Sequence, residues 1–338
     1  MIDVILNNQH FLIYLSFIMV ITGILKEKGY LVDVFSLILK TVKSKKLVLF
    51  LISLFGGVLP IPGRVAVSAG ILDTIAPKDK QGRENYGIID YLSTHHYYIW
   101  SPLEKTVIIP MAILGVTYGE LMGMVYPLLI ISILVIGVYI YKFQDGNIEI
   151  PKHHQVNYKN IYSIFLPFIL TLVLAGLTDR YLPLFCGFTL YLVSYSNSWG
   201  KLLKHVKWRL VLSVGIVIIV SNLISLYGNE IKTNLEGFTS DHNILLVGTL
   251  CFIGSFLLGS SGKYAGIVSL VTSIMGIQYF LFLFTMCYSG YLLSPTHKCI
   301  YIGQQYFGTP IKKYILSISL WVIIMIVYSS LDLTFTIK

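Results

Sequence analysis

The sequence predicts an all-α polytopic membrane protein made of two inverted-topology repeats, each with a re-entrant hairpin and a broken transmembrane helix. Three observations lead to this fold class: an apolar composition, hydrophobic segments long enough to span a bilayer, and a pattern of breaks that occurs once in each half. Of 338 residues, 55% are hydrophobic and 12% are charged, and the mean hydropathy is +0.75. A water-exposed exterior would need far more charge. We therefore expect the chain to lie in a lipid bilayer, whose hydrocarbon core is about 30 Å thick.

Uninterrupted hydrophobic segments predict the simple spans. They lie at 10–25, 30–43, 121–141, 161–177, 181–196, 208–227 and 310–331. The segment 30–43 is short and carries Asp33, so it either crosses the membrane or lies at its interface. The N-terminus lacks the basic region and small-residue cleavage site of a signal peptide, so we expect the first hydrophobic segment to be retained.

A Gly-rich break followed by a Ser-Pro break occurs in each half. The first half has Gly-Gly-Val-Leu-Pro-Ile-Pro-Gly-Arg at 56–64 and Ser-Pro at 101–102. The second half has Gly-Ser-Ser-Gly-Lys at 259–263 and Ser-Pro at 294–295. Proline removes a backbone donor and clashes with the preceding turn, so each Ser-Pro pair should interrupt a helix. Paired interruptions in two halves are typical of the binding site of a secondary transporter.

These breaks define the expected domain organisation. The first repeat is 1–141, with a hairpin at 46–76 and a broken helix at 88–118. A polar linker at 142–160 joins it to the second repeat. The second repeat is 161–338, with a hairpin at 243–276 and a broken helix at 277–308. Free backbone groups at membrane depth require protein or a water-filled cavity around them, so we expect the four breaks to cluster.

The charged loops predict the orientation of the spans. Lysine and arginine are concentrated in short loops, as the positive-inside bias predicts. The basic loops lie at 40–46, 78–83, 142–160, 201–209 and 312–313. The loop 228–242 carries three acids and one lysine. Placing every basic loop in the cytoplasm puts the C-terminus outside and inverts the repeats, and the N-terminus depends on whether 30–43 crosses.

The same bias accounts for the net charge of +9, so no nucleic-acid partner is expected. We expect a multi-pass protein of the cytoplasmic (inner) membrane.

Cations at the breaks are the candidate substrate-binding groups. Arg64 and Lys263 begin the returning half-helices, and Lys105 and Lys298 follow the Ser-Pro breaks. A helix N-terminus attracts anions, and a charge at membrane depth costs at least about 2.5–3.5 kcal/mol and marks function. The alternative is that these side chains snorkel to an interface. The full candidate substrate site is Pro62, Gly63, Arg64, Ser101, Lys105, Ser260, Ser261, Gly262, Lys263, Ser294, Thr296 and Lys298.

Glu104 and His297 are the candidate ion-coupling residues, because each lies in a broken helix and can titrate. A structural ion pair is the alternative for Glu104, and a satisfied buried histidine is the alternative for His297. Adjacent His95 and His96 point to different faces of a helix, so they predict no metal site. The four cysteines are scattered singly, and no nucleotide fingerprint is present. We therefore expect neither a metal nor a cofactor.

Three stretches carry a resemblance to a known family. They are Gly-Val-Leu-Pro-Ile-Pro-Gly at 57–63, Ile-Asp-Tyr-Leu-Ser-Thr-His-His at 89–96 and Ser-Gly-Tyr-Leu-Leu-Ser-Pro-Thr-His-Lys-Cys at 289–299. The chain resembles an uncharacterised prokaryotic integral-membrane family of the ion-transporter superfamily, whose relatives carry citrate, dicarboxylates, gluconate and arsenite. The resemblance implies inverted repeats, two re-entrant hairpins and anion transport with Na⁺ or H⁺. The Ser-Asn-Thr hairpin signatures of the Na⁺-coupled dicarboxylate branch are absent.

The leading functional hypothesis is a secondary active transporter of a small anion, an organic carboxylate, that works by alternating access coupled to H⁺ or Na⁺. An anion channel or an uncoupled membrane assembly partner is the alternative. A membrane-embedded enzyme that acts on a lipid-soluble substrate through Glu104, His297 and Ser294 is a third hypothesis. Related carriers suggest a homodimer.

Overall fold

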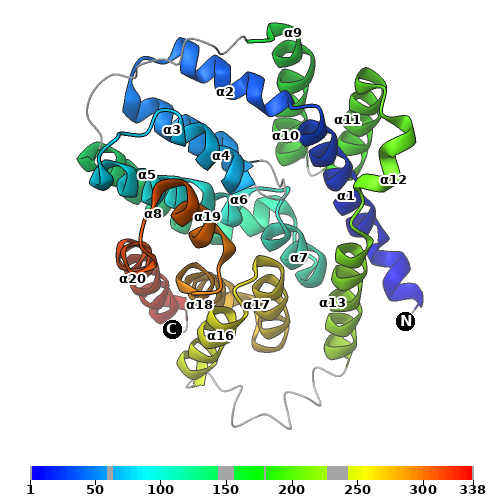
Figure 1. The fold of residues 1–338 in the computed structure, drawn as a ribbon. Coiled ribbons are helices and arrows are strands. Elements are labelled where there is room, and N and C mark those ends of the chain that lie inside the picture. The colour runs from blue at the N-terminus through cyan, green and yellow to red at the C-terminus, as the bar shows by residue number, and fades with distance from the viewer. Residues whose placement is uncertain (1, 59–63, 144–155, 179, 227–242, 337–338) are drawn as a thin grey trace.

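The structure is a computed structural model that describes residues 2–58, 64–143, 156–178, 180–226 and 243–336. Every regular element in these ranges is a helix (Figure 1). The all-α prediction is therefore confirmed.

The first half contains eight described helices. They are α1 (Ile2–Glu27), α2 (Tyr30–Thr41), α3 (Lys45–Val58), α4 (Arg64–Asp73), α5 (Lys80–His95), α6 (Tyr97–Trp100), α7 (Lys105–Leu114) and α8 (Tyr118–Phe143). The expected tip of the first hairpin, at 59–63, lies outside the described residues.

The second half continues with α9 (Tyr158–Asn160), a π-helical turn (Ile161–Phe165), α10 (Leu166–Thr178), α11 (Tyr181–Ser196), α12 (Leu202–His205) and α13 (Trp208–Leu226). After the acidic loop, which also lies outside the described residues, come α16 (Ile244–Leu258), α17 (Ser261–Met275), α18 (Phe280–Leu293), α19 (Lys298–Phe307) and α20 (Ile311–Thr336).

Four described helices are long and apolar enough to cross a membrane. They are His10–Glu27, Tyr118–Lys142, Tyr158–Thr178 and Ile311–Phe335. Large apolar side chains on these helices face outward, for example Leu134 at 63% and Leu177 at 77% exposure. Such an exterior is stable in lipid and not in water. The chain is a multi-pass integral membrane protein.

The short helix α2 holds its acidic residue in a polar contact. Asp33 accepts hydrogen bonds from the backbone N–H of Asn157 at 3.3 Å and from Nδ2 of Asn160 at 2.7 Å. With 12 residues, α2 is about 18 Å long at 1.5 Å per residue. A single helix of this length is shorter than a hydrocarbon core about 30 Å thick.

Both Ser-Pro breaks interrupt a helix where the sequence predicts. The helix α6 ends at Trp100 and α7 begins at Lys105, while α18 ends at Leu293 and α19 begins at Lys298. The second interruption bends the chain by 40° between Ile277–Leu293 and Lys298–Phe307.

Two helices begin earlier than predicted, by eight and by three residues, and local caps explain why. The helix expected to begin at residue 88 begins at Lys80, because the Asp79 carboxylate accepts from the Gly82 N–H at 2.7 Å. The span expected from 121 begins at Tyr118. There Thr117 and Glu120 form a capping box, with the Thr117 N–H donating to Glu120 Oε2 at 2.8 Å.

The elements after each Gly-rich break pack against the other half of the chain. The helix α4 packs on α19, and α17 packs on α7. In parallel, α3 packs on α5 and α16 packs on α18. Each half therefore meets the break of the other half, and this reciprocal packing is consistent with two repeats.

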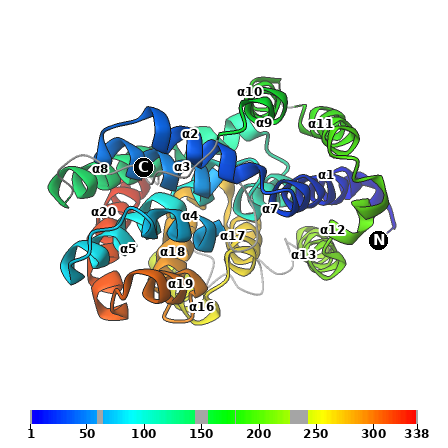
Figure 2. The same ribbon diagram turned by 45° about the horizontal axis from the view of Figure 1, so that its top comes forward.

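A second group of helices stands beside this core. In both views, α1, α10, α11, α12 and α13 lie to one side, and α7 and α17 lie at the junction (Figures 1 and 2). The helix α1 contacts α11, α12 and α13 in this group, while α13 also reaches α7 and α17.

Contacts also join loops that the charge bias places on one side. Lys46 Nζ donates to the carbonyl oxygen of Tyr141 at 3.2 Å, near the end of α8. Lys201 pairs with Glu27 at the end of α1. Lys313 Nζ lies 2.8 Å from Glu84 Oε2. Each of these contacts joins two segments that are far apart in the sequence.

Candidate functional site

A cavity of about 940 Å³ lies between the two groups of helices. Its walls come from α1, α4, α7, α12, α17 and α19, together with the break before α7. Five lysines line it: Lys26, Lys105, Lys204, Lys207 and Lys298. Among the described residues, two acids do so, Glu27 and Glu104. The described lining therefore carries more basic than acidic side chains.

The first break supplies an adjacent acid and base to this cavity. Glu104 occupies the N-cap position of α7 and is 4% exposed, and Lys105 is the first residue of the helix. A carboxylate at a helix N-terminus interacts favourably with the helix dipole, whereas a lysine there does not. The Lys105 ammonium group is therefore placed where an anion would stabilise it.

The second Gly-rich break approaches the same lysine. A Cβ atom built on Gly262 would lie 3.5 Å from Lys105 Cδ and 4.0 Å from Lys105 Nζ. Ser261, the first residue of α17, lines the cavity. Residues on opposite halves of the chain thus form one wall, and the N–H groups at the start of α17 lie beside it.

The second Ser-Pro break contacts the end of the second Gly-rich break. Gly259 has φ 53°, and a Cβ atom built there would overlap Thr296 Oγ1 and lie 2.8 Å from Ser294 Oγ. Ser294 and Thr296 are themselves linked through their hydroxyl oxygens at 2.9 Å. These side chains pack the break against Gly259 and are not cavity-lining groups.

A smaller cavity of about 390 Å³ lies next to the first along α1. His10, Phe11 and Tyr14 line the smaller cavity, whereas residues from Leu15 to Glu27 line the larger one. At the break, Pro102 faces the smaller cavity and Leu103 the larger. The Tyr14 hydroxyl donates to the Pro102 carbonyl oxygen at 2.7 Å. This hydrogen bond therefore lies in the layer of residues where the two cavities adjoin.

Comparison with known proteins supplies the family and the fold. The sequence profile of a family described as "Protein of unknown function (DUF401)" matches residues 1–335. The chain belongs to the DUF401 family. The comparison with curated protein sequences gives no match.

Among solved structures, this DUF401 chain is similar to one described as "Crystal structure of the Alcanivorax borkumensis YdaH transporter reveals an unusual topology". The TM-score is 0.61 at 12% identity, over 98% of this chain and 86% of the other. At that identity the likeness establishes a shared fold, and that fold is one that a transporter uses.

The structure brings part of the predicted site together. Glu104, Lys105, Ser261 and Lys298 line the cavity. The residues near it that do not line it are Ser101, Ser260, Gly262, Ser294 and Thr296. Lys263 is exposed and lies off the cavity wall.

The other predicted site residues are Pro62, Gly63, Arg64 and His297. Pro62 and Gly63 lie outside the described residues. Arg64 begins α4, but its side chain also lies outside the description, while the adjacent Val65 lines the cavity. His297 is 2% exposed and lies behind the wall that Cys299 forms.

The sequence did not predict four cavity-lining residues on or next to α1 and α12, namely Lys26, Lys204, His205 and Lys207. All four lie at span ends or in a short basic loop, where the positive-inside bias already explains a cation. Their position on the cavity follows from the packing of α12 on α1. This packing is tight, because a Cβ atom on Gly23 would collide with the His205 ring.

Proposed function

We propose that this chain is a secondary active transporter of a small anion, an organic carboxylate, in the cytoplasmic membrane. The observation that carries the proposal is the basic cavity, in which Lys105 from one half lies over Gly262 from the other. A carboxylate fits because lysine ammonium groups and helix N–H groups together satisfy its two oxygens.

The charge of the cavity argues for binding. The Glu27 carboxylate forms an ion pair with Lys201 and also lies near His205, whose Nε2 is 3.4 Å from Glu27 Oε2. Among the described lining residues, five lysines stand against two acids. An excess of basic side chains around a cavity attracts an anionic ligand.

Alternating access is the mechanism that the two cavities support. The larger cavity reaches the face that carries Lys204 and Lys207, which the charge bias places in the cytoplasm. The smaller cavity begins on the other side of the Tyr14–Pro102 hydrogen bond. Movement of the core against the group that contains α1 would break this layer and open the opposite side.

We infer that the two repeats are inverted and that the chain is related to the ion-transporter superfamily. Reciprocal packing of α4 on α19 and of α17 on α7 supports the repeats. We place ion coupling at Glu104, the buried acid of the break, with H⁺ or Na⁺ as the ion.

Ligand-dependent thermal stability of the purified protein tests the proposal. A panel of small carboxylates and inorganic anions is screened with and without Na⁺. At a hundredfold excess over its dissociation constant, a ligand adds about 2.7 kcal/mol to native stability. We expect one class of anion to stabilise the wild type and Lys312→Met, an exposed position at the start of α20 that does not line the cavity, but not Lys105→Met. Equal stabilisation of all three proteins would overturn the assignment of the cavity.

A further inference from the structure

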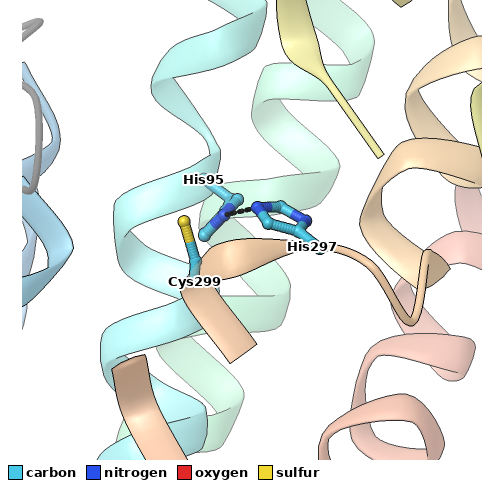
Figure 3. Close-up of side chains that lie close together, drawn as sticks. All are labelled: His95, His297 and Cys299. Carbon is cyan, nitrogen blue, oxygen red and sulfur yellow. Dashed lines mark hydrogen bonds between the residues drawn. The ribbon is translucent and has the colours of Figure 1, made fainter. Parts of the chain in front are cut away.

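A cluster of three metal-ligating side chains lies behind the cavity wall. His95 ends α5, His297 caps α19, and Cys299 lies in the first turn of α19 (Figure 3). The two Nε2 atoms are 3.1 Å apart. One ligand atom from each of the three residues lies within 4.8 Å of the others. Both histidines are buried, whereas Cys299 is half-buried and lines the large cavity.

The hydrogen bonds of the two rings fix their tautomers. His95 Nδ1 lies 2.5 Å from the carbonyl oxygen of Tyr91, which can only accept, so Nδ1 carries the proton. His297 Nδ1 lies 3.2 Å from the carbonyl oxygen of Tyr291 and 2.9 Å from the Tyr91 hydroxyl. That hydroxyl donates to the carbonyl oxygen of Leu292 at 3.0 Å, so it accepts from His297.

Both Nε2 atoms consequently carry lone pairs, and the two atoms lie 3.1 Å apart (Figure 3). Two acceptors at this distance repel unless one cation binds both of them. Donation of the second ring N–H to a backbone carbonyl is also the arrangement that orients histidines in metal sites.

Aromatic stacking holds the rings in this orientation. The His95 ring stacks on Tyr91 at a centroid distance of 3.9 Å and an interplanar angle of 18°. The His297 ring lies on Tyr291 at 4.2 Å and 33°. The donor atoms are therefore positioned before any ion arrives, which lowers the ordering cost of binding.

We propose that His95, His297 and Cys299 bind a d¹⁰ transition-metal ion, Zn²⁺ or Cu⁺. Imidazole nitrogen and thiolate sulfur are the ligands that both ions favour. With bonds of about 2.0–2.1 Å, two nitrogens of a tetrahedral zinc site are about 3.3 Å apart, close to the 3.1 Å between the two Nε2 atoms.

The charge and the access of the site agree with such an ion. Loading takes the thiol proton of Cys299 into cavity water and leaves a thiolate on the metal. With Cu⁺ the site is then neutral, and with Zn²⁺ it keeps one positive charge and a fourth position. Because Cys299 lines the cavity, the ion can enter from there, and an anion or water from the cavity can fill that fourth position.

Metal titration of the purified protein tests this site independently of transport. Protein stripped with a chelator is titrated with Co²⁺ as a spectroscopic substitute for Zn²⁺, and with Cu⁺ against a chromogenic competitor. Bound metal is counted by elemental analysis. We expect one equivalent, with a thiolate-to-cobalt charge-transfer band that Cys299→Ser abolishes and Cys186→Ser, at a half-buried position on α11, retains.

A second variant separates the site from a folding effect. Tyr91→Phe keeps the ring that stacks on His95 but removes the hydroxyl that accepts from His297. We expect its metal affinity to fall about 10–100-fold at unchanged stoichiometry. Less than about a tenth of an equivalent of either metal on folded wild type would overturn the proposal, as would a cobalt spectrum that survives Cys299→Ser. If the two histidines bind only a proton, the folded wild type will bind almost no metal.

Discussion

Replacing Gly259 by alanine tests the contact on which the shape of the second break depends. Gly259 has φ 53° and ends α16, directly before α17 begins. An added Cβ atom would overlap Thr296 Oγ1 and meet Ser294 Oγ at 2.8 Å. The substitution therefore adds backbone strain and steric overlap at a single point.

The magnitude follows from the two contributions. A left-handed conformation costs a residue with a Cβ atom about 1–2 kcal/mol. Overpacking against the Ser-Pro-Thr break adds about 1–3 kcal/mol, so the expected loss is about 2–5 kcal/mol. Gly115 is the matched control, because it has φ 67° and nothing within 4 Å of its Cβ position. Gly115→Ala should lose only the backbone part, about 1–2 kcal/mol.

Denaturant unfolding of the purified variants in detergent measures the difference. Gly259→Ala should be less stable than Gly115→Ala by about 1–3 kcal/mol, and Thr296→Ala in the same chain should recover part of that difference by removing the overlapping oxygen. Equal losses for Gly259→Ala and Gly115→Ala would refute the close approach of the Gly-rich break to the Ser-Pro break.

Three further experiments test the transport mechanism and the topology. Glu104→Gln should abolish ion-driven accumulation while retaining substrate exchange in proteoliposomes; retained accumulation would move coupling elsewhere. Tyr14→Phe removes a hydrogen bond worth about 1 kcal/mol, so labelling of Cys299 from the side of the smaller cavity should rise about fivefold, and an unchanged rate would argue against this barrier. With the native cysteines replaced, a cysteine at Lys142 should react with an impermeant maleimide only from the cytoplasm and one at Thr334 only from outside; the reverse pattern would invert the topology.

Local chemistry explains why the breaks were predictable from sequence. Proline cannot continue a helix hydrogen-bond ladder, so the interruptions before Lys105 and Lys298 follow from Ser101-Pro102 and Ser294-Pro295 wherever those segments lie. The same argument could not tell which hydroxyls face a ligand. Ser294 and Thr296 pack against Gly259, a contact between segments that are 35 and 37 residues apart.

The cavity was predictable only in part. Glu104, Lys105, Ser261 and Lys298 were found because each lies beside a break. Lys204 and Lys207 were not, since a lysine in a short loop has the same sequence signature whether it faces solvent or a cavity. The histidine cluster could not be predicted from the sequence either. His95 and His297 are 202 residues apart, and the packing of α19 on α5 brings them together.

Counterflow in proteoliposomes measures the central claim most directly. Proteoliposomes that contain the purified chain are loaded with one unlabelled small carboxylate, and the labelled form of the same compound is added outside. The experiment is repeated for each member of the panel. We expect saturable exchange of at least one carboxylate, an affinity about tenfold or more weaker in Lys105→Met, and near wild-type exchange in Lys312→Met. Folded protein that exchanges no small anion, or Lys105→Met that exchanges as the wild type does, would contradict it.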